Sequence, residues 1–260
     1  KQKWWILLTL LLCGCGASSQ PDQTGAVQND RPRLSASTEE TAESVAEVEK
    51  NENLEKNPSN SNQNPGEGQN WTVFAMDTVM QFDAYGGSAA LQEKVKRRVE
   101  ELEGELSTTQ ENSDIFYLNQ EKTAKLSDDT RYLMQEALAL GAETDGALDI
   151  SIYPVVQSWG FTTGNYRVPS ESERESLLKS VDYRLVGLEA DTASIEPGMM
   201  VDLGGVGKGF TGDEVVKTMK GDGVTSALFS LGGNIQTIGT KPDGEKWYVG
   251  IKDPESDGYL

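Results

Sequence analysis

The sequence contains no histidine and only two cysteines, Cys13 and Cys15, both within its first 15 residues. A Cys-x-Cys metal or disulfide element therefore has no further cysteine or histidine to complete it. Positive charge is also scarce, since 23 Lys and Arg residues face 42 Asp and Glu residues and the formal net charge is -19. This acidity argues against nucleic acid as a partner and against electrostatic attachment to anionic lipid.

Residues 1–15 have the order of a bacterial export signal. Two lysines precede an apolar run over residues 4–12, which is too short to cross the roughly 30 Å of bilayer hydrocarbon as a helix. The following Leu-Cys-Gly-Cys ends at Cys15 and resembles the lipobox of bacterial lipoproteins, in which this cysteine is acylated. We expect a lipid anchor on Cys15 that holds the protein on the outward face of a cell membrane or inner membrane. An ordinary secretory signal with a chance cysteine pair is the alternative.

The rest of the chain divides at residue 70. Residues 16–70 consist largely of Ser, Thr, Asn, Gln, Glu and Pro with few apolar clusters, and such a segment buries too little apolar surface to offset its chain entropy. We therefore expect a disordered tether there. Residues 71–260 carry alternating and periodic apolar positions and suit one large domain or two small interwoven lobes.

Apolar spacing and caps predict the elements of this domain. Strands are expected over residues 71–85, 184–190, 225–231 and 247–251. Helices are expected over residues 89–106 and 128–144, from Ser170, where Ser-x-x-Glu has capping-box spacing, and from Val215. The class is α+β or mixed α/β, and no internal repeat is visible.

A glycine-rich segment over residues 200–213 is the first candidate for chemistry. We interpret it as a strand, a glycine turn and a helix start, an arrangement that offers backbone N–H groups to a phosphate. It matches neither a Walker loop, because Lys208 is followed by glycine, nor the dinucleotide fingerprint. The pattern alone favours a phosphate or nucleotide site only modestly over a tight structural turn. Lys208 tips the interpretation toward function, because its ammonium group would face the same anion.

Two further segments carry glycine. In residues 144–154 a helix is expected to end at Gly146, and Asp149 lies between apolar neighbours. Its carboxylate would be a turn residue, which the residues alone favour, or a ligand for a hydroxyl, an amide or a metal. In residues 227–235 a strand breaks at two glycines, which lets another backbone or a flat ligand come close. Close packing of a crossing strand explains that break at least as well.

Taken together, these segments occur in the order and spacing of one family. They are Met76-Asp-Thr78, residues 112–119, Thr144-Asp-Gly-Ala-Leu-Asp149, Asp202-Leu-Gly-Gly-Val-Gly-Lys-Gly209, and Leu231-Gly-Gly-Asn234 followed by residues 247–254. Over essentially all of residues 71–260 the chain resembles the FAD:protein FMN transferases, the ApbE family. The resemblance implies an α+β fold with a mainly antiparallel sheet, whose C-terminal part would lie beyond Leu260.

The resemblance also implies an enzyme that binds FAD and Mg2+. Such an enzyme transfers FMN to a threonine, or sometimes serine, hydroxyl of an exported or membrane-bound target protein and releases AMP. Met76 would contact the flavin, and Lys208 would meet the bound dinucleotide. The FAD site, chiefly its adenosine end, would be lined by Ala147, Leu148 and Asp149.

Some positions depart from the family pattern. Asp77 stands where the family usually has glycine, and Thr109 lies about where many members place a flavin-contacting tyrosine, so it is the candidate flavin contact there. The implied metal ligand in this part of the chain is the backbone carbonyl of Gly205. The remaining implied ligands, an Asp and a Thr, and a His near the active site belong to a segment beyond Leu260. We therefore expect these 260 residues alone to be catalytically inactive and the full-length gene product to be active.

Two rival functions share these features. A lipid-anchored protein could bind FAD and hydrolyse it to FMN and AMP, and its product would be free rather than protein-bound FMN. A solute-binding lipoprotein would share the signal, the lipobox and the tether. It would need two α/β lobes with repeated strand-helix units, and it would not purify as a yellow protein that releases FAD on heating.

Overall fold

The computed structural model describes residues 68–256, 258 and 259. The expected export signal, the lipidation at Cys15 and the tether up to residue 67 lie outside the described residues. Among the residues that the structure describes, no helix is long and apolar enough to cross a membrane.

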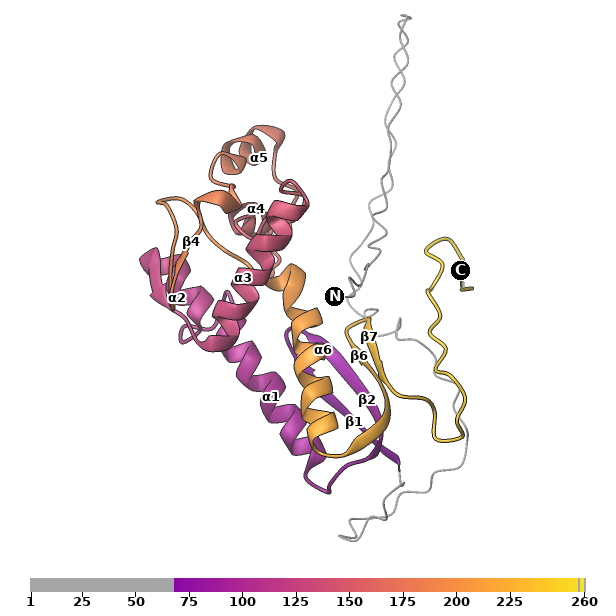
Figure 1. Ribbon diagram of the computed structural model, residues 1–260. Coiled ribbons are helices and arrows are strands. Elements are labelled where there is room, and N and C mark those ends of the chain that lie inside the picture. Colours follow the sequence, from indigo (N-terminus) through magenta and orange to yellow (C-terminus); the bar gives the residue numbers. More distant parts are fainter. Residues whose placement is uncertain (1–67, 257, 260) are drawn as a thin grey trace, which may run out of the picture. The chain divides into compact units, whose positions relative to one another are not determined.

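A four-stranded antiparallel sheet forms one half of the domain (Figure 1). Its order is β1 (Gly68–Ala75), β2 (Thr78–Gly86), β6 (Val224–Leu231) and β7 (Asn234–Ile238). These strands confirm the strand predictions for residues 71–85 and 225–231. Because β1 begins at Gly68, residues 68–70 belong to the sheet, and the predicted tether extends three residues too far.

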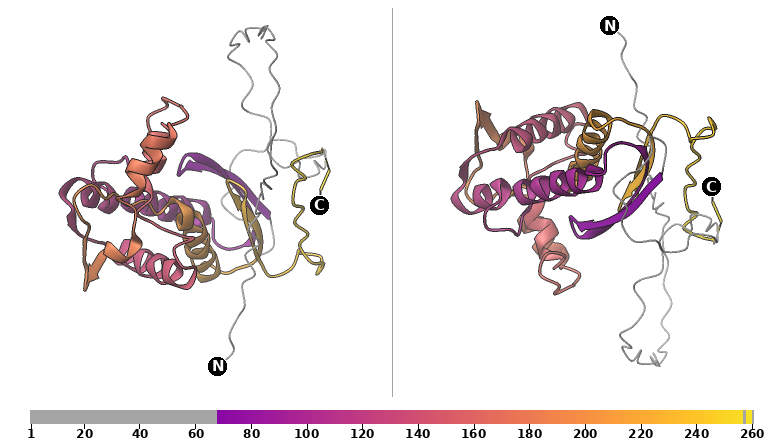
Figure 2. Two further views of the ribbon diagram at one scale, coloured as in Figure 1. Left: turned by 90° about the horizontal axis from the view of Figure 1, so that it is seen from above. Right: turned by 90° about the horizontal axis from the view of Figure 1, so that it is seen from below.

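Helices α1 (Leu91–Leu106) and α6 (Gly204–Gly221) pack side by side on one face of this sheet (Figures 1 and 2). Alternate residues of the strands and the apolar stripe of α1 meet there, as the predicted helix over residues 89–106 requires. The aromatic rings of Phe82 and Phe229 stack 5.7 Å apart at its centre. The buried residues of this first core include Val73, Met80, Phe82, Leu91, Val95, Val99, Val215, Met219, Phe229 and Leu231.

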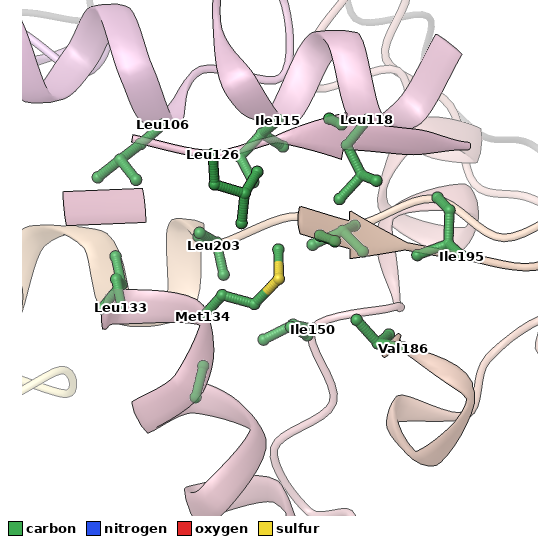
Figure 3. Close-up of a cluster of buried hydrophobic side chains, with 14 of the residues drawn as sticks. Leu106, Ile115, Leu118, Leu126, Leu133, Met134, Ile150, Val186, Ile195 and Leu203 are labelled. Atoms are coloured by element: carbon green, nitrogen blue, oxygen red, sulfur yellow. The ribbon is translucent and has the colours of Figure 1, made fainter. Parts of the chain in front are cut away.

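A second core lies at the other ends of the same two helices (Figure 3). It is enclosed by α2 (Asp114–Glu121), α3 (Asp128–Glu143) and a small antiparallel sheet of order β3-β5-β4, with β3 (Thr123–Lys125), β4 (Gly187–Glu189) and β5 (Thr192–Ser194). Leu106 of α1 and Phe210 of α6 reach into it. The two cores therefore share α1 and α6, and the arrangement of helices and antiparallel sheets confirms the α+β class.

The remaining elements are α4 (Tyr153–Ser158), α5 (Glu171–Leu178) and a 3-10 turn over Tyr183–Leu185. The predicted capping at the start of α5 is confirmed, because the Ser170 hydroxyl oxygen accepts the N–H of Glu173 at 3.2 Å. The predicted helix over residues 128–144 is confirmed as α3.

Three predicted elements differ from the structure. Helix α6 begins at Gly204 rather than near Val215, so the expected glycine turn is itself helical. Residues 184–190 are only partly strand, because the Asp182 carboxylate accepts the N–H of Arg184 and caps a 3-10 turn before β4. Residues 247–251 form no strand within the described part of the chain, since they pair with no described strand.

Candidate functional site

The segment after α3 lies against the start of α6. The N–H of Asp202 donates to the carbonyl oxygen of Ile150 at 2.8 Å, and Ile152 forms a parallel bridge with Met200. A Cβ placed on Gly205 would lie 3.7 Å from Cδ1 of Leu148. The structure thus brings together the predicted residues of the 147–149 segment and Gly205, which are far apart in the sequence.

Asp149 itself holds the turn that presents this segment. Its Oδ1 accepts the N–H and the hydroxyl of Ser151 at 2.8 and 2.6 Å, and its Oδ2 accepts the N–H of Tyr183 at 3.0 Å. Asp149 is therefore a turn residue in the structure, as the sequence alone favours. Ala147 is exposed and Leu148 is half-buried beside it, so these two residues form the accessible side of the segment.

The first turns of α6 form the opposite side of the site. Oδ1 of Asp202 accepts the N–H of Gly204 at 2.8 Å, while Gly204 and Gly205 are exposed and Lys208 is half-buried. The N-terminal end of a helix carries partial positive charge, and Lys208 adds a full charge one turn later. Sequence reasoning named Lys208 but did not single out Asp202, whose acidic side chain before a glycine pair was its only signal.

Met76 lies beside the second turn of α6. Met76 and Asp77 form the two-residue turn between β1 and β2, and their φ angles are 51° and 56°. The Thr211 hydroxyl donates to Sδ of Met76 at 3.5 Å, and the N–H of Met76 donates to Oε1 of Glu103 at 2.7 Å. The predicted flavin contact is thus held next to the helix that carries Lys208.

The turn between β6 and β7 meets this first hairpin. Gly232 and Gly233 have φ angles of 59° and 90°, and a Cβ on Gly232 would lie only 2.2 Å from Oγ1 of Thr78. The N–H of Gly232 also donates to the carbonyl oxygen of Val79 at 3.2 Å, so close packing against the start of β2 accounts for the break at Gly232.

Thr109 is the one predicted contact that the structure does not bring to this group. It is exposed in the loop between α1 and α2, where its N–H donates to Oγ of Ser107 at 3.1 Å and its hydroxyl lies 3.2 Å from the same oxygen. Its local role is therefore an ST-type turn, typical of short hydroxyl side chains in loops.

An arginine ties α6 to its two neighbouring helices. Arg98 on α1 donates to Oδ2 of Asp129 on α3 at 2.6 Å and to Oε2 of Glu214 on α6 at 2.7 Å. The hydrogen bond with Asp129 is the main reason that the pKa of Arg98 lies above its usual value. Burial raises the pKa of Glu214, but hydrogen bonds from Lys217 and Arg98 outweigh burial and lower it. Both groups are therefore charged at neutral pH, and their ion pair holds α6 against α1.

The described residues do not form a complete Mg2+ site. Between residues 68 and 259, as far as they are described, no group of three or more Asp, Glu, Cys or His side chains lies close enough to hold a metal ion. Gly205 lies in the first turn of α6, so its backbone carbonyl belongs to the helical ladder. Magnesium sites in proteins usually contain at least one carboxylate.

The turn at Asp77 yields a stability prediction. Positive φ at both central residues is the requirement of a type I′ hairpin turn, which favours glycine at the second position. We expect Asp77→Gly to raise the free energy of unfolding by about 0.5 kcal/mol, and Asp77→Val to lower it by about 1–2 kcal/mol because a β-branched residue is strained there. Urea denaturation of both variants measures these changes, and a shift of both in the same direction would refute this explanation.

Comparison with known proteins gives matches over the same region. The model of the ApbE family matches residues 76–260. A protein of Vibrio cholerae named FAD:protein FMN transferase is 29% identical over 176 residues, which cover 65% of this chain and 53% of the relative. A protein of Escherichia coli K12 with the same name is 27% identical over 198 residues, covering 72% of this chain and 56% of the relative. The chain thus spans just over half the length of these curated relatives.

Solved structures show the same fold. The flavin transferase ApbE from Vibrio cholerae aligns with a TM-score of 0.67 and 27% identity, covering 73% of this chain and 65% of that protein. The ApbE protein of Thermotoga maritima aligns with a TM-score of 0.69 and 26% identity, covering 75% and 66%. The α+β arrangement of helices and antiparallel sheet is therefore that of the ApbE structures.

Proposed function

The chain belongs to the ApbE family, and on that premise we propose that it forms the FAD-binding part of an FAD:protein FMN transferase. One observation carries the proposal: Met76, in the hairpin turn, and Leu148 both contact the N-terminal half of α6, the helix that bears Lys208. The names of the relatives support FAD as the substrate. FAD is a dinucleotide with a negatively charged pyrophosphate at its centre, so it fits a site with apolar contacts around a cationic helix start.

In this proposal each residue has a binding role. Lys208 neutralises the pyrophosphate, Met76 lies against the flavin, and Ala147 and Leu148 contact the adenosine half. A threonine or serine hydroxyl oxygen of the target protein then attacks the phosphorus of the FMN half and gives up its proton to solvent. The bond from that phosphorus to the bridging oxygen breaks, and AMP leaves. Such phosphoryl transfer depends mainly on positioning and charge neutralisation.

The dependence on Mg2+ stays a prediction. When bound, the metal would neutralise charge on the pyrophosphate. The carbonyl oxygen of Gly205 would contribute a ligand through the lone pair that its helical hydrogen bond leaves free. The described residues do not complete a metal site by themselves.

We further propose that the protein acts outside the cytoplasm, anchored to a bacterial membrane by lipid on Cys15. The support is the order of charged, apolar and small residues before that cysteine. An exported or membrane-bound target would be met on the same side of the membrane. We expect Cys15→Ser to release the protein from the membrane fraction and to leave its FAD affinity unchanged. Loss of both anchoring and FAD binding, measured by fractionation and fluorescence titration, would contradict this division of roles.

The products separate a transferase from its nearest rival, an FAD pyrophosphatase. The complete gene product is incubated with FAD, Mg2+ and a target protein that carries the acceptor threonine, alongside the same target with that threonine changed to valine. A transferase yields AMP and fluorescent FMN bound to the first target only. Free FMN with either target would identify the pyrophosphatase.

The rival from another class, a solute-binding lipoprotein, makes a different prediction. It would lack bound flavin and would not form AMP from FAD. The described sheets are antiparallel, whereas that class was expected to show repeated strand-helix units in two lobes. The antiparallel sheets therefore favour the transferase.

A further inference from the structure

The backbone of Met76 is held by a carboxylate from a different element. Oε1 of Glu103, on the last two turns of α1, accepts the N–H of Met76 at 2.7 Å. This N–H belongs to the first central residue of a two-residue hairpin turn, and it has no partner within the turn itself. A hydrogen bond to a charged acceptor is stronger than one between neutral groups, so Glu103 fixes this N–H firmly.

The conformation that Glu103 holds is an unusual one for methionine. Met76 has a φ of 51°, in the left-handed region that residues other than Gly, Asn and Asp rarely adopt. Such a conformation persists only where the surroundings enforce it, and strained residues of this kind cluster at functional sites. Glu103 supplies one of the contacts that enforce it.

The side chain of Met76 is held as well. The hydroxyl of Thr211, a fully buried residue of α6, donates to its Sδ at 3.5 Å, and Met76 packs against both hydrophobic cores. Methionine has three rotatable side-chain bonds and adapts readily to its surroundings. Fixing its backbone from α1 and its sulfur from α6 therefore removes freedom that a flexible contact residue otherwise keeps.

We propose that Glu103 is a positioning residue for substrate binding: it holds the backbone of Met76 so that the methionine side chain stays fixed beside the Lys208 helix before FAD arrives. This inference rests on the proposed function, which places the flavin against Met76. Glu103 touches Met76 and not the substrate, so its effect is on the preorganisation of the contact.

The test compares three variants of the 260-residue chain. Glu103→Ala removes the acceptor, Glu103→Gln keeps an oxygen acceptor without the charge, and Glu101→Ala removes a neighbouring carboxylate whose side chain is half exposed on the same helix. The first readout needs no ligand: the methyl resonance of Met76 in protein labelled with 13C at the methionine methyl groups, assigned with Met76→Leu. The second readout is FAD affinity from flavin fluorescence, and urea unfolding checks that each variant is folded.

We expect Glu103→Ala to shift and broaden the Met76 methyl resonance and to weaken FAD binding about tenfold. Glu103→Gln should recover most of both signals, and Glu101→Ala should change neither. An unchanged methyl resonance in folded Glu103→Ala would overturn the positioning role. If that variant does not fold, Glu103→Gln takes its place, and weaker FAD binding by folded Glu103→Gln with an unchanged Met76 resonance would overturn the role. If the methyl resonance responds as expected but the wild-type chain binds no FAD, the positioning of Met76 stands and the proposed function fails.

Discussion

Replacing Asn119 with leucine is expected to lower the free energy of unfolding by about 2–5 kcal/mol, because it leaves two buried backbone groups without partners. The side chain of Asn119 is buried at the end of α2. Its Nδ2 donates to the carbonyl oxygen of Val201 at 2.8 Å, and its Oδ1 accepts the N–H of Val201 at 2.6 Å. Val201 is itself fully buried, so water cannot replace either bond without opening the core.

The Asn119 pair positions the segment that leads into α6. Val201 lies three residues before Gly204, and the ammonium group of Lys122 holds the carbonyl oxygen of Met199 at 3.1 Å nearby. Urea unfolding measures the expected loss, and Gln120→Leu, at the exposed neighbouring position, is the matched control and should change stability by less than about 0.5 kcal/mol. A loss of under about 1 kcal/mol in Asn119→Leu would show that the paired bonds matter little.

Removing the charge of Lys208 is expected to weaken FAD binding by about 10- to 100-fold, the effect of losing a charge-assisted hydrogen bond in a partly buried site. Lys208→Met keeps the length of the aliphatic side chain, so packing against α6 changes little. Lys217→Met is the matched control, because Lys217 lies on the same helix, is exposed and pairs with Glu214.

The Lys208 prediction is measured by titrating FAD into each variant and following the flavin fluorescence. Riboflavin, which has no phosphate, serves as a second ligand, and its affinity should be the same in wild type and Lys208→Met. An equal loss of affinity for both ligands would mean that Lys208 supports the fold of the site rather than the pyrophosphate. No loss for FAD would exclude Lys208 from the site.

Much of the fold follows from local patterns in the sequence. The apolar stripe of α1, with Leu91, Val95, Val99 and Leu102 at spacings of three and four, predicts the helix and its buried face. The serine caps of α3 and α5 also act locally, through Ser127 and Ser170. Such elements need no knowledge of distant residues.

The errors come where distant contacts outweigh local propensity. Glycine is a poor helix former, so the sequence pattern predicts the start of α6 about ten residues too late. Tertiary packing gives one glycine of α6 a reason, because a Cβ on Gly212 would lie 2.2 Å from Nε2 of Gln236 on β7. Residues 247–251 have a strand-like composition, but a strand also needs a partner, and Tyr248 and Ile251 are exposed within the described residues.

The candidate site likewise contains residues that the sequence predicts and residues whose role depends on distant contacts. Family motifs identified Met76, residues 147–149, Gly205 and Lys208; Gly205 and Lys208 lie in the N-terminal half of α6, and Met76 and Leu148 contact it. The sequence does not predict the roles of Glu103 and Asn119, because a glutamate on a charged helix and an asparagine at a helix end are common in any sequence. Their importance depends on the backbone groups that the fold brings to them.

The central claim is that these residues form an FAD site, and its most direct test is FAD binding by the 260-residue chain itself. The account predicts saturable quenching of flavin fluorescence with one molecule bound per chain, and release of intact FAD on heating. A chain that unfolds cooperatively in urea, and is therefore folded, but neither quenches nor retains FAD would contradict it.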